Sequence, residues 1–158
     1  MNKRKIVIIC TSWLMVAITM LMIVALSMQN AETSGATSKS QIEVILNAFL
    51  GEENVTEELV RSFQIPTRKL AHFGIYMLLG FALSNAFNNT FKRKFIYFAM
   101  VAGVLYSFFD EFVLQRNSYG RGPSIFDVLI DSGGVIVGFG LYFLILVINN
   151  SRKKKQQA

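Results

Sequence analysis

Residues 125–148 have the sequence IFDVLIDSGGVIVGFGLYFLILVI, a long apolar segment whose only charged residues are Asp127 and Asp131. A helix needs about 20 predominantly apolar residues to cross the roughly 30 Å hydrocarbon core of a bilayer. Three further apolar blocks of comparable length lie at residues 6–28, 70–87 and 95–114. The sequence therefore predicts an all-α membrane protein with four transmembrane helices.

The composition agrees with this fold class. Apolar residues make up 53% of the 158 residues, aromatic residues 13%, and the mean hydropathy is +0.43. The first block follows Lys3-Arg4-Lys5 and could alternatively be a signal peptide, but its apolar run exceeds the about 7–15 residues usual for one and no small-x-small cleavage site follows. We therefore expect an uncleaved span. Cys10 is the only cysteine, which excludes an intramolecular disulfide.

The distribution of charge predicts the orientation in the membrane. Basic residues without acidic neighbours occupy both ends of the chain and the segment between the second and third blocks: Lys3, Arg4, Lys5, Lys92, Arg93, Lys94, Arg152, Lys153, Lys154 and Lys155. All ten acidic residues lie on the opposite side of the predicted spans. The positive-inside rule then predicts cytoplasmic termini. We interpret the net charge of +6 as cations facing anionic lipid headgroups, not as a nucleic-acid-binding surface.

We divide the chain into a cytoplasmic N-terminus with the first span (1–28), an external amphipathic region (29–67), a three-span core (68–148) and a basic cytoplasmic tail (149–158). Residues 29–40 are rich in Ser, Thr, Ala and Gly, as is typical of a linker. Apolar residues recur at helical spacing from Ile42 to Leu50, and Asn54 is placed to cap a second amphipathic helix. Pro66 is expected to end this region. The prediction is an external helical hairpin that lies on the membrane surface or covers the spans.

Polar residues gather at the outer ends of spans two, three and four. They are Arg68, Lys69 and His72 on span two, Asp110, Glu111 and Gln115 on span three, Arg121 in the following loop, and Asp127 and Asp131 on span four. A carboxylate at a bilayer centre costs at least about 2.5 kcal/mol unless it is paired, hydrated or protonated. Adjacent residues point about 100° apart on an α-helix, so one network is not expected to neutralise Asp110 and Glu111 equally. Gly134 and Gly138 are spaced to allow close helix packing.

Several of these residues together resemble a known family. The stretch RKLAHFGIY at 68–76, the pattern Asp110-Glu111-x-x-x-Gln115, and then Arg121, Asp127 and Gly134-x-x-x-Gly138 are similar to the VanZ-like family of small bacterial membrane proteins. The family usually has a polar residue, often asparagine, near the position of Asp131, so this chain carries an additional carboxylate. The resemblance implies a place in the bacterial cell membrane and lower susceptibility to glycopeptide and lipoglycopeptide antibiotics of the teicoplanin type. It does not imply a particular reaction.

The leading hypothesis is an outward-facing pocket that binds the headgroup of a membrane lipid, a lipid-linked cell-wall precursor or a lipoglycopeptide. Its cations would hold a phosphate or carboxylate, and its acidic residues and Gln115 would orient those cations or accept hydrogen bonds from hydroxyls. The candidate ligand-binding residues are Arg68, Lys69, His72, Asp110, Glu111, Gln115, Arg121, Asp127 and Asp131.

Three alternatives stay open at this point. The polar residues could form a purely structural interhelical network. They could instead form an enzyme site in which His72 with Asp110 or Glu111 supplies acid–base chemistry on a lipid or wall precursor. Proton-coupled transport is a weaker alternative, because four spans without an evident repeat do not suggest a transporter. No metal or other cofactor is expected, because the chain has a single histidine and no HExxH spacing.

Overall fold

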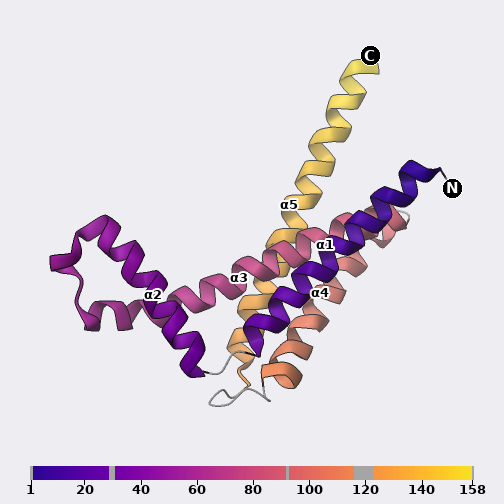
Figure 1. Cartoon of the computed structure of the whole chain (residues 1–158). Helices are drawn as coiled ribbons and strands as arrows, with labels where there is room; N and C mark the ends of the chain where they lie inside the picture. The colour runs from indigo at the N-terminus through magenta and orange to yellow at the C-terminus, as the bar shows by residue number, and fades with distance from the viewer. Residues whose placement is uncertain (1, 29–30, 92, 116–122, 158) are drawn as a thin grey trace.

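In the computed structural model of the protein, residues 2–28, 31–91, 93–115 and 123–157 are described, and no β-strand occurs among them (Figure 1). The main helices are α1 (Lys3–Ser27), α2 (Ala31–Leu50), α3 (Glu57–Thr90), α4 (Tyr97–Phe109) and α5 (Ile125–Gln157). Two short 3₁₀ turns, η1 (Glu52–Asn54) and η2 (Arg93–Phe95), precede α3 and α4, and a π-helical turn, η3 (Asp110–Leu114), follows α4 directly.

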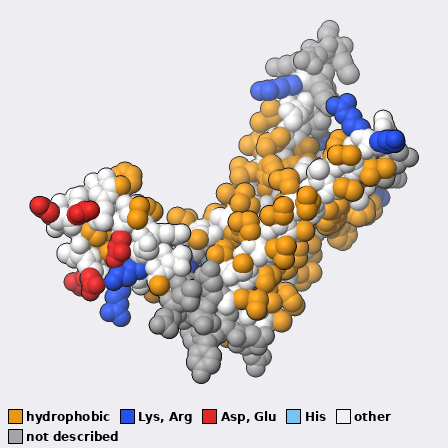
Figure 2. Space-filling model, in the orientation of Figure 1, with side chains coloured by type: hydrophobic (Ala, Val, Ile, Leu, Met, Phe, Trp, Pro, Cys, Tyr) orange, Lys and Arg blue, Asp and Glu red, His pale blue; other side chains and the backbone are white. Residues whose placement is uncertain are grey.

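Four helical segments are long and apolar enough to cross a membrane: Lys3–Ser27, Glu57–Thr90, Arg93–Leu114 and Ile125–Arg152. The predicted all-helical fold with four spans is therefore confirmed. Apolar side chains cover much of the face of the bundle that Figure 2 shows, and many large ones are exposed, including Leu21 at 68% and Leu105 at 63%. In a membrane protein such side chains face lipid, whereas in water they would form an unusually large exposed apolar patch.

The start of α1 and the end of α5 point toward the same end of the bundle as the end of α3 (Figure 1). Basic side chains are visible at this end in Figure 2, whereas the visible acidic side chains lie on the hairpin at the other side. This arrangement is the one that the charge distribution requires if both termini share a compartment. That the compartment is the cytoplasm stays a prediction.

The core of the bundle is the crossing of α3 with α5. A Cβ atom added at Gly134 or Gly138 would meet the backbone carbonyl oxygens of Phe73 and Met77 on α3. A Cβ atom at Gly80 would likewise meet the backbone of Val135 on α5. The two glycines of α5 that the sequence singled out thus lie where the two backbones approach most closely, which is how small residues serve helix packing in membranes.

Polar side chains join α1 to α3 at the end of the bundle that carries the termini. The hydroxyl of Ser12 accepts hydrogen bonds from the amides of Asn89 at 2.9 Å and Asn85 at 3.2 Å. The indole of Trp13 donates to the hydroxyl of Thr90 at 2.9 Å. Hydrogen bonds of this kind between spans contribute about 0.6–2 kcal/mol each.

The region between the first two spans differs from the prediction in its details. Residues 31–40, predicted to be a linker, are helical and form the first half of α2, because packing against α3 outweighs the low helix propensity of Ser, Thr and Gly. The N-cap of α3 is Thr56, whose hydroxyl accepts from the Leu59 N–H at 3.3 Å. The predicted cap Asn54 instead donates to the carbonyl of Leu50 at 2.8 Å.

Helix α3 runs through Pro66 without a break, so this proline does not end a helix. That it marks the end of the external region stays a prediction. A proline inside a helix removes one backbone hydrogen bond and costs about 3 kcal/mol. Packing on both sides of it offsets that cost, since Val60 before it is 2% exposed and Tyr76 after it is 0% exposed. The predicted boundary between residues 67 and 68 consequently falls inside one continuous helix.

Candidate functional site

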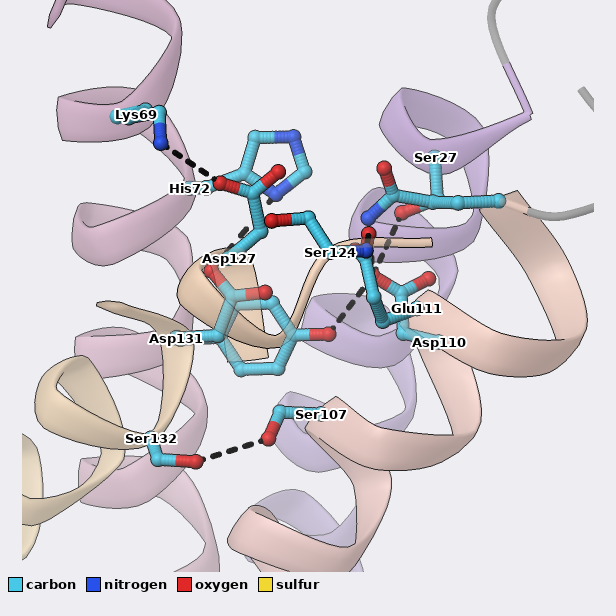
Figure 3. Close-up of polar contacts among 12 residues, drawn as sticks. Ser27, Lys69, His72, Ser107, Asp110, Glu111, Ser124, Asp127, Asp131 and Ser132 are labelled. Atoms are coloured by element: carbon cyan, nitrogen blue, oxygen red, sulfur yellow. Dashed lines mark hydrogen bonds and ion pairs between the residues drawn. The ribbon is translucent and has the colours of Figure 1, made fainter. Parts of the chain in front are cut away.

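Polar residues from three elements meet at the end of the bundle opposite the termini (Figure 3). Helix α3 contributes Lys69 and His72, η3 contributes Asp110 and Glu111, and α5 contributes Asp127 and Asp131. The sequence placed these residues at one depth, and the structure brings them into one cluster. Arg121 lies outside the described residues.

Asp110 is the centre of the hydrogen bonding in this cluster. Its Oδ2 atom accepts from the Ser27 hydroxyl at 2.8 Å, from the Tyr76 hydroxyl at 2.9 Å and from the Gln115 amide at 3.4 Å. The side chain is fully buried. Charge-assisted hydrogen bonds are the strong ones in proteins, so Asp110 connects α1, α3 and η3 through one carboxylate oxygen.

The π-helical turn explains how two adjacent carboxylates are both fully buried. Asp110 is its first residue and Glu111 its second. A π-helical turn inserts an extra residue into the helix and often occurs at functional sites. The two carboxylates bond to different partners: Glu111 Oε1 accepts from the backbone N–H of Ser124, immediately before α5, at 2.7 Å. A carboxylate at this position satisfies a free N–H group and opposes the positive end of the helix dipole.

Two further pairs connect α3 to α5. Lys69 Nζ lies 2.9 Å from Asp127 Oδ1, and both side chains are about one-third exposed, so this ion pair is partly screened by solvent. His72 Nδ1 lies 3.9 Å from Asp131 Oδ1, which is too long for a hydrogen bond. Asp131 is 1% exposed, and neither of its oxygens accepts a hydrogen bond within the part of the chain that the structure describes.

Two cavities adjoin the cluster, and Arg68 and His72 line both of them. The smaller has a volume of about 20 Å³ and is lined by Arg68, Lys69, His72, Gln115, Asp127, Ile130 and Asp131. The larger, of about 160 Å³, is lined by Leu26, Thr37, Ser38, Gln41, Thr67, Arg68, Ala71 and His72. We call this larger space the α2 chamber. Helix α2 forms one of its walls, so the hairpin is part of the site.

Several residues of the site were not singled out in the sequence. Ser27 bonds to Asp110 from a helix that looked uniformly apolar, and Thr37, Ser38 and Gln41 come from or beside the segment predicted to be a linker. The sequence does carry a pattern that could have identified Ser27. The buried residues of α1 recur at three- and four-residue spacing, and the polar ones among them are Ser12, Thr19 and Ser27.

Ser107 lies about one helical turn before Asp110 and Glu111, so its surroundings bear on the acid–base alternative. Its hydroxyl donates to the carbonyl of Val104 at 2.8 Å and lies 3.0 Å from the hydroxyl of Ser132. A serine nucleophile requires a base within hydrogen-bond distance. Ser107 contacts a backbone carbonyl and another hydroxyl, and these contacts do not form a Ser–His pair.

A search of curated proteins and a search of solved structures each gave no match. The family model described as VanZ/LLP1 matches residues 12–146, which begins within the first span, ends within the fourth and includes the whole polar cluster. With its four apolar helices, the chain is a multi-pass membrane protein that belongs to the VanZ-like family.

Proposed function

We propose that the α2 chamber binds the phosphate-bearing headgroup of a membrane lipid or a lipid-linked cell-wall precursor in the bacterial cell membrane. By occupying or presenting that headgroup at the outer surface, the protein lowers the susceptibility of the cell to lipoglycopeptides of the teicoplanin type. The observation that carries the proposal is the chamber itself: a space of about 160 Å³ between three helices, with a cation and polar side chains in its walls.

The lining of the chamber suits such a headgroup. Arg68 offers a planar fork of N–H donors that matches a phosphate. Thr67 and Gln41 supply further groups that can bond to phosphate or sugar oxygens. Leu26 and Ala71 give the chamber an apolar wall, which suits the lipid tail next to the headgroup. Pockets of this kind combine apolar walls with a few polar groups that fix the orientation of the ligand.

The acidic cluster next to the chamber holds in place the part of α3 that carries Arg68 and Lys69. Lys69 is engaged by Asp127 at 2.9 Å, so it is held against α5 while Arg68 lines both cavities. Phosphate binding would therefore depend first on Arg68. His72 also lines the chamber, whereas Lys69 acts indirectly, because its ion pair with Asp127 holds this part of α3 against α5.

The test of the resistance component compares variants of one helix in a susceptible Gram-positive host. We expect expression of the wild-type protein to raise the teicoplanin concentration needed to inhibit growth, and Arg68→Gln to remove most of that increase. Arg61→Gln is the matched control, because Arg61 lies on the same helix but lines a separate surface hollow with Lys39 and Glu57. Equal protection by wild type and R68Q at equal protein level in the membrane would contradict the proposal.

A second measurement tests the headgroup directly. In nanodiscs, native mass spectrometry is expected to show retained phosphatidylglycerol on wild type and R61Q, and about tenfold less on R68Q, as for the loss of one charge-assisted contact. Equal retention by all three would exclude the chamber as the site. Extracted lipids and wall precursors should be chemically unchanged. A new modified species would favour the enzymatic alternative.

A further inference from the structure

We propose that His72, Asp110 and Asp131 form a binding site for one divalent transition-metal cation of the Mn²⁺ or Zn²⁺ type. The three residues come from α3, η3 and α5, and one ligand atom from each lies within 4.8 Å of the others. Ligand atoms around one such ion lie about 3–4 Å apart when the metal–ligand bonds are near 2.1 Å. Small side-chain rotations are therefore enough to close the three atoms around an ion.

The hydrogen bonding of Asp110 and Asp131 is the independent observation that points to a ligand. Both side chains are at most 1% exposed, yet Asp110 Oδ1 and both oxygens of Asp131 accept no hydrogen bond from the residues that the structure describes. Buried carboxylate oxygens without partners are strongly unfavourable. A divalent cation between them supplies the missing partner for both residues at once.

The other oxygen of Asp110, Oδ2, accepts hydrogen bonds that hold the carboxylate in position, as is common for carboxylates that bind metals. The hydroxyls of Ser27 and Tyr76 donate to Oδ2 at 2.8 and 2.9 Å, which fixes the carboxylate and leaves Oδ1 for the ion. Metal-binding carboxylates are commonly held by such hydrogen bonds, and loss of one typically lowers metal affinity by about 10–100-fold. The nearby cation Lys69 is engaged by Asp127.

The donor set selects the class of metal. One imidazole and two carboxylates suit Mn²⁺ or Zn²⁺ better than Ca²⁺ or Mg²⁺, which prefer oxygen ligands throughout. The adjoining cavity of about 20 Å³ has room for one water molecule, which can occupy a further coordination position. The sequence predicted no metal, because the chain has a single histidine and no HExxH spacing, whereas the proposed ligands are that one histidine and two carboxylates from three separate elements.

This inference does not depend on the headgroup proposal, and its test needs no added lipid. The full-length protein with Cys10→Ser, which removes the only thiol, is purified in detergent, stripped with chelator and titrated with Mn²⁺ or Zn²⁺ alone. We expect one ion per chain and a metal-dependent rise in melting temperature. Asp131→Asn and His72→Gln should lower the affinity by about 100-fold or more, and Tyr76→Phe by about 10–100-fold. Glu58→Gln, on the exposed start of α3, should have no effect.

Tyr76→Phe retains the aromatic ring and is expected to fold. It therefore keeps the proposal testable if the carboxylate and histidine variants do not fold. If D131N or H72Q does not fold, the affinity and stoichiometry of Y76F and E58Q decide the result. Absence of binding by the folded wild-type protein would overturn the proposal. Equal binding by wild type and Y76F, or by wild type and a folded D131N, would overturn it as well, because the ion would then lie elsewhere.

Discussion

At the scale of single residues, Asp110 attaches the C-terminal end of the first span to the rest of the bundle. One of its oxygens accepts from Ser27 at the end of α1 and from Tyr76 in the middle of α3. Both donors are fully buried hydroxyls. A hydroxyl bonded to a buried carboxylate stabilises more than one bonded to a neutral group, and its removal leaves the carboxylate less well solvated.

We therefore expect Ser27→Ala and Tyr76→Phe each to lower the free energy of unfolding by about 1–2 kcal/mol. Because both donors share one acceptor atom, the double variant should deviate from the sum of the single effects. Thermal unfolding in a fixed detergent measures all three. Ser62→Ala is the matched control, since Ser62 is exposed and bonds to the carbonyl of Leu59 in its own helix. A loss in S62A as large as in S27A would contradict the role assigned to Asp110.

At the scale of helices, the close approach of α3 and α5 sets the geometry of the site. The glycines of α5 at this crossing are at 134 and 138, a few residues after Asp131. If the two backbones moved apart, the distances from His72 to Asp131 and from Lys69 to Asp127 would increase as well. Helix packing and site geometry are thus determined by the same contact.

Gly138→Ala should consequently destabilise the protein by about 1–3 kcal/mol, the usual range for an inserted methyl group that has no space. The added Cβ would meet the backbone oxygen of Met77, which cannot rotate away as a side chain could. Gly140→Ala is the control on the same helix, because nothing lies within 4 Å of a Cβ atom there. Equal unfolding temperatures for G138A and G140A would show that the helices do not approach as described.

The boundaries of the elements show where sequence patterns were sufficient and where they were not. The four spans follow from long apolar blocks, which depend on local composition alone. The helical state of residues 31–40 and the passage of α3 through Pro66 depend on packing between segments that are distant in sequence. The same limit applies to the site: the polar residues could be assigned to one depth, but the π-helical turn, the bond from Ser27 and the α2 wall of the chamber are tertiary features.

At the scale of the whole molecule, the two ends of the bundle differ in chemistry. The end with the termini carries basic side chains and the Ser12–Asn85–Asn89 hydrogen bonds, and the other carries the acidic cluster and the hairpin. A bilayer with an anionic cytoplasmic surface favours the first end inside. The predicted orientation follows from this asymmetry.

Cysteine labelling in intact cells tests the orientation. In the Cys10→Ser background, Glu53→Cys between α2 and α3 should react with a membrane-impermeant maleimide from outside. Arg152→Cys near the end of α5 should react only after permeabilisation. The reverse pattern would place the chamber on the cytoplasmic side and remove the basis for a role at the outer surface.

The continuity of α3 has a mechanical consequence. This helix has 34 residues and is therefore about 51 Å long, and it carries the hairpin at one end and the polar side chains of the bundle along its middle. A displacement of α2 relative to the bundle must either bend helix α3 or rotate it. Pro66 is the point at which it bends most easily. Arg68 lies two residues after Pro66 and His72 six residues after it, and both line the cavities. Bending of α3 at Pro66 would therefore move cavity-lining residues that lie within two helical turns of the bend.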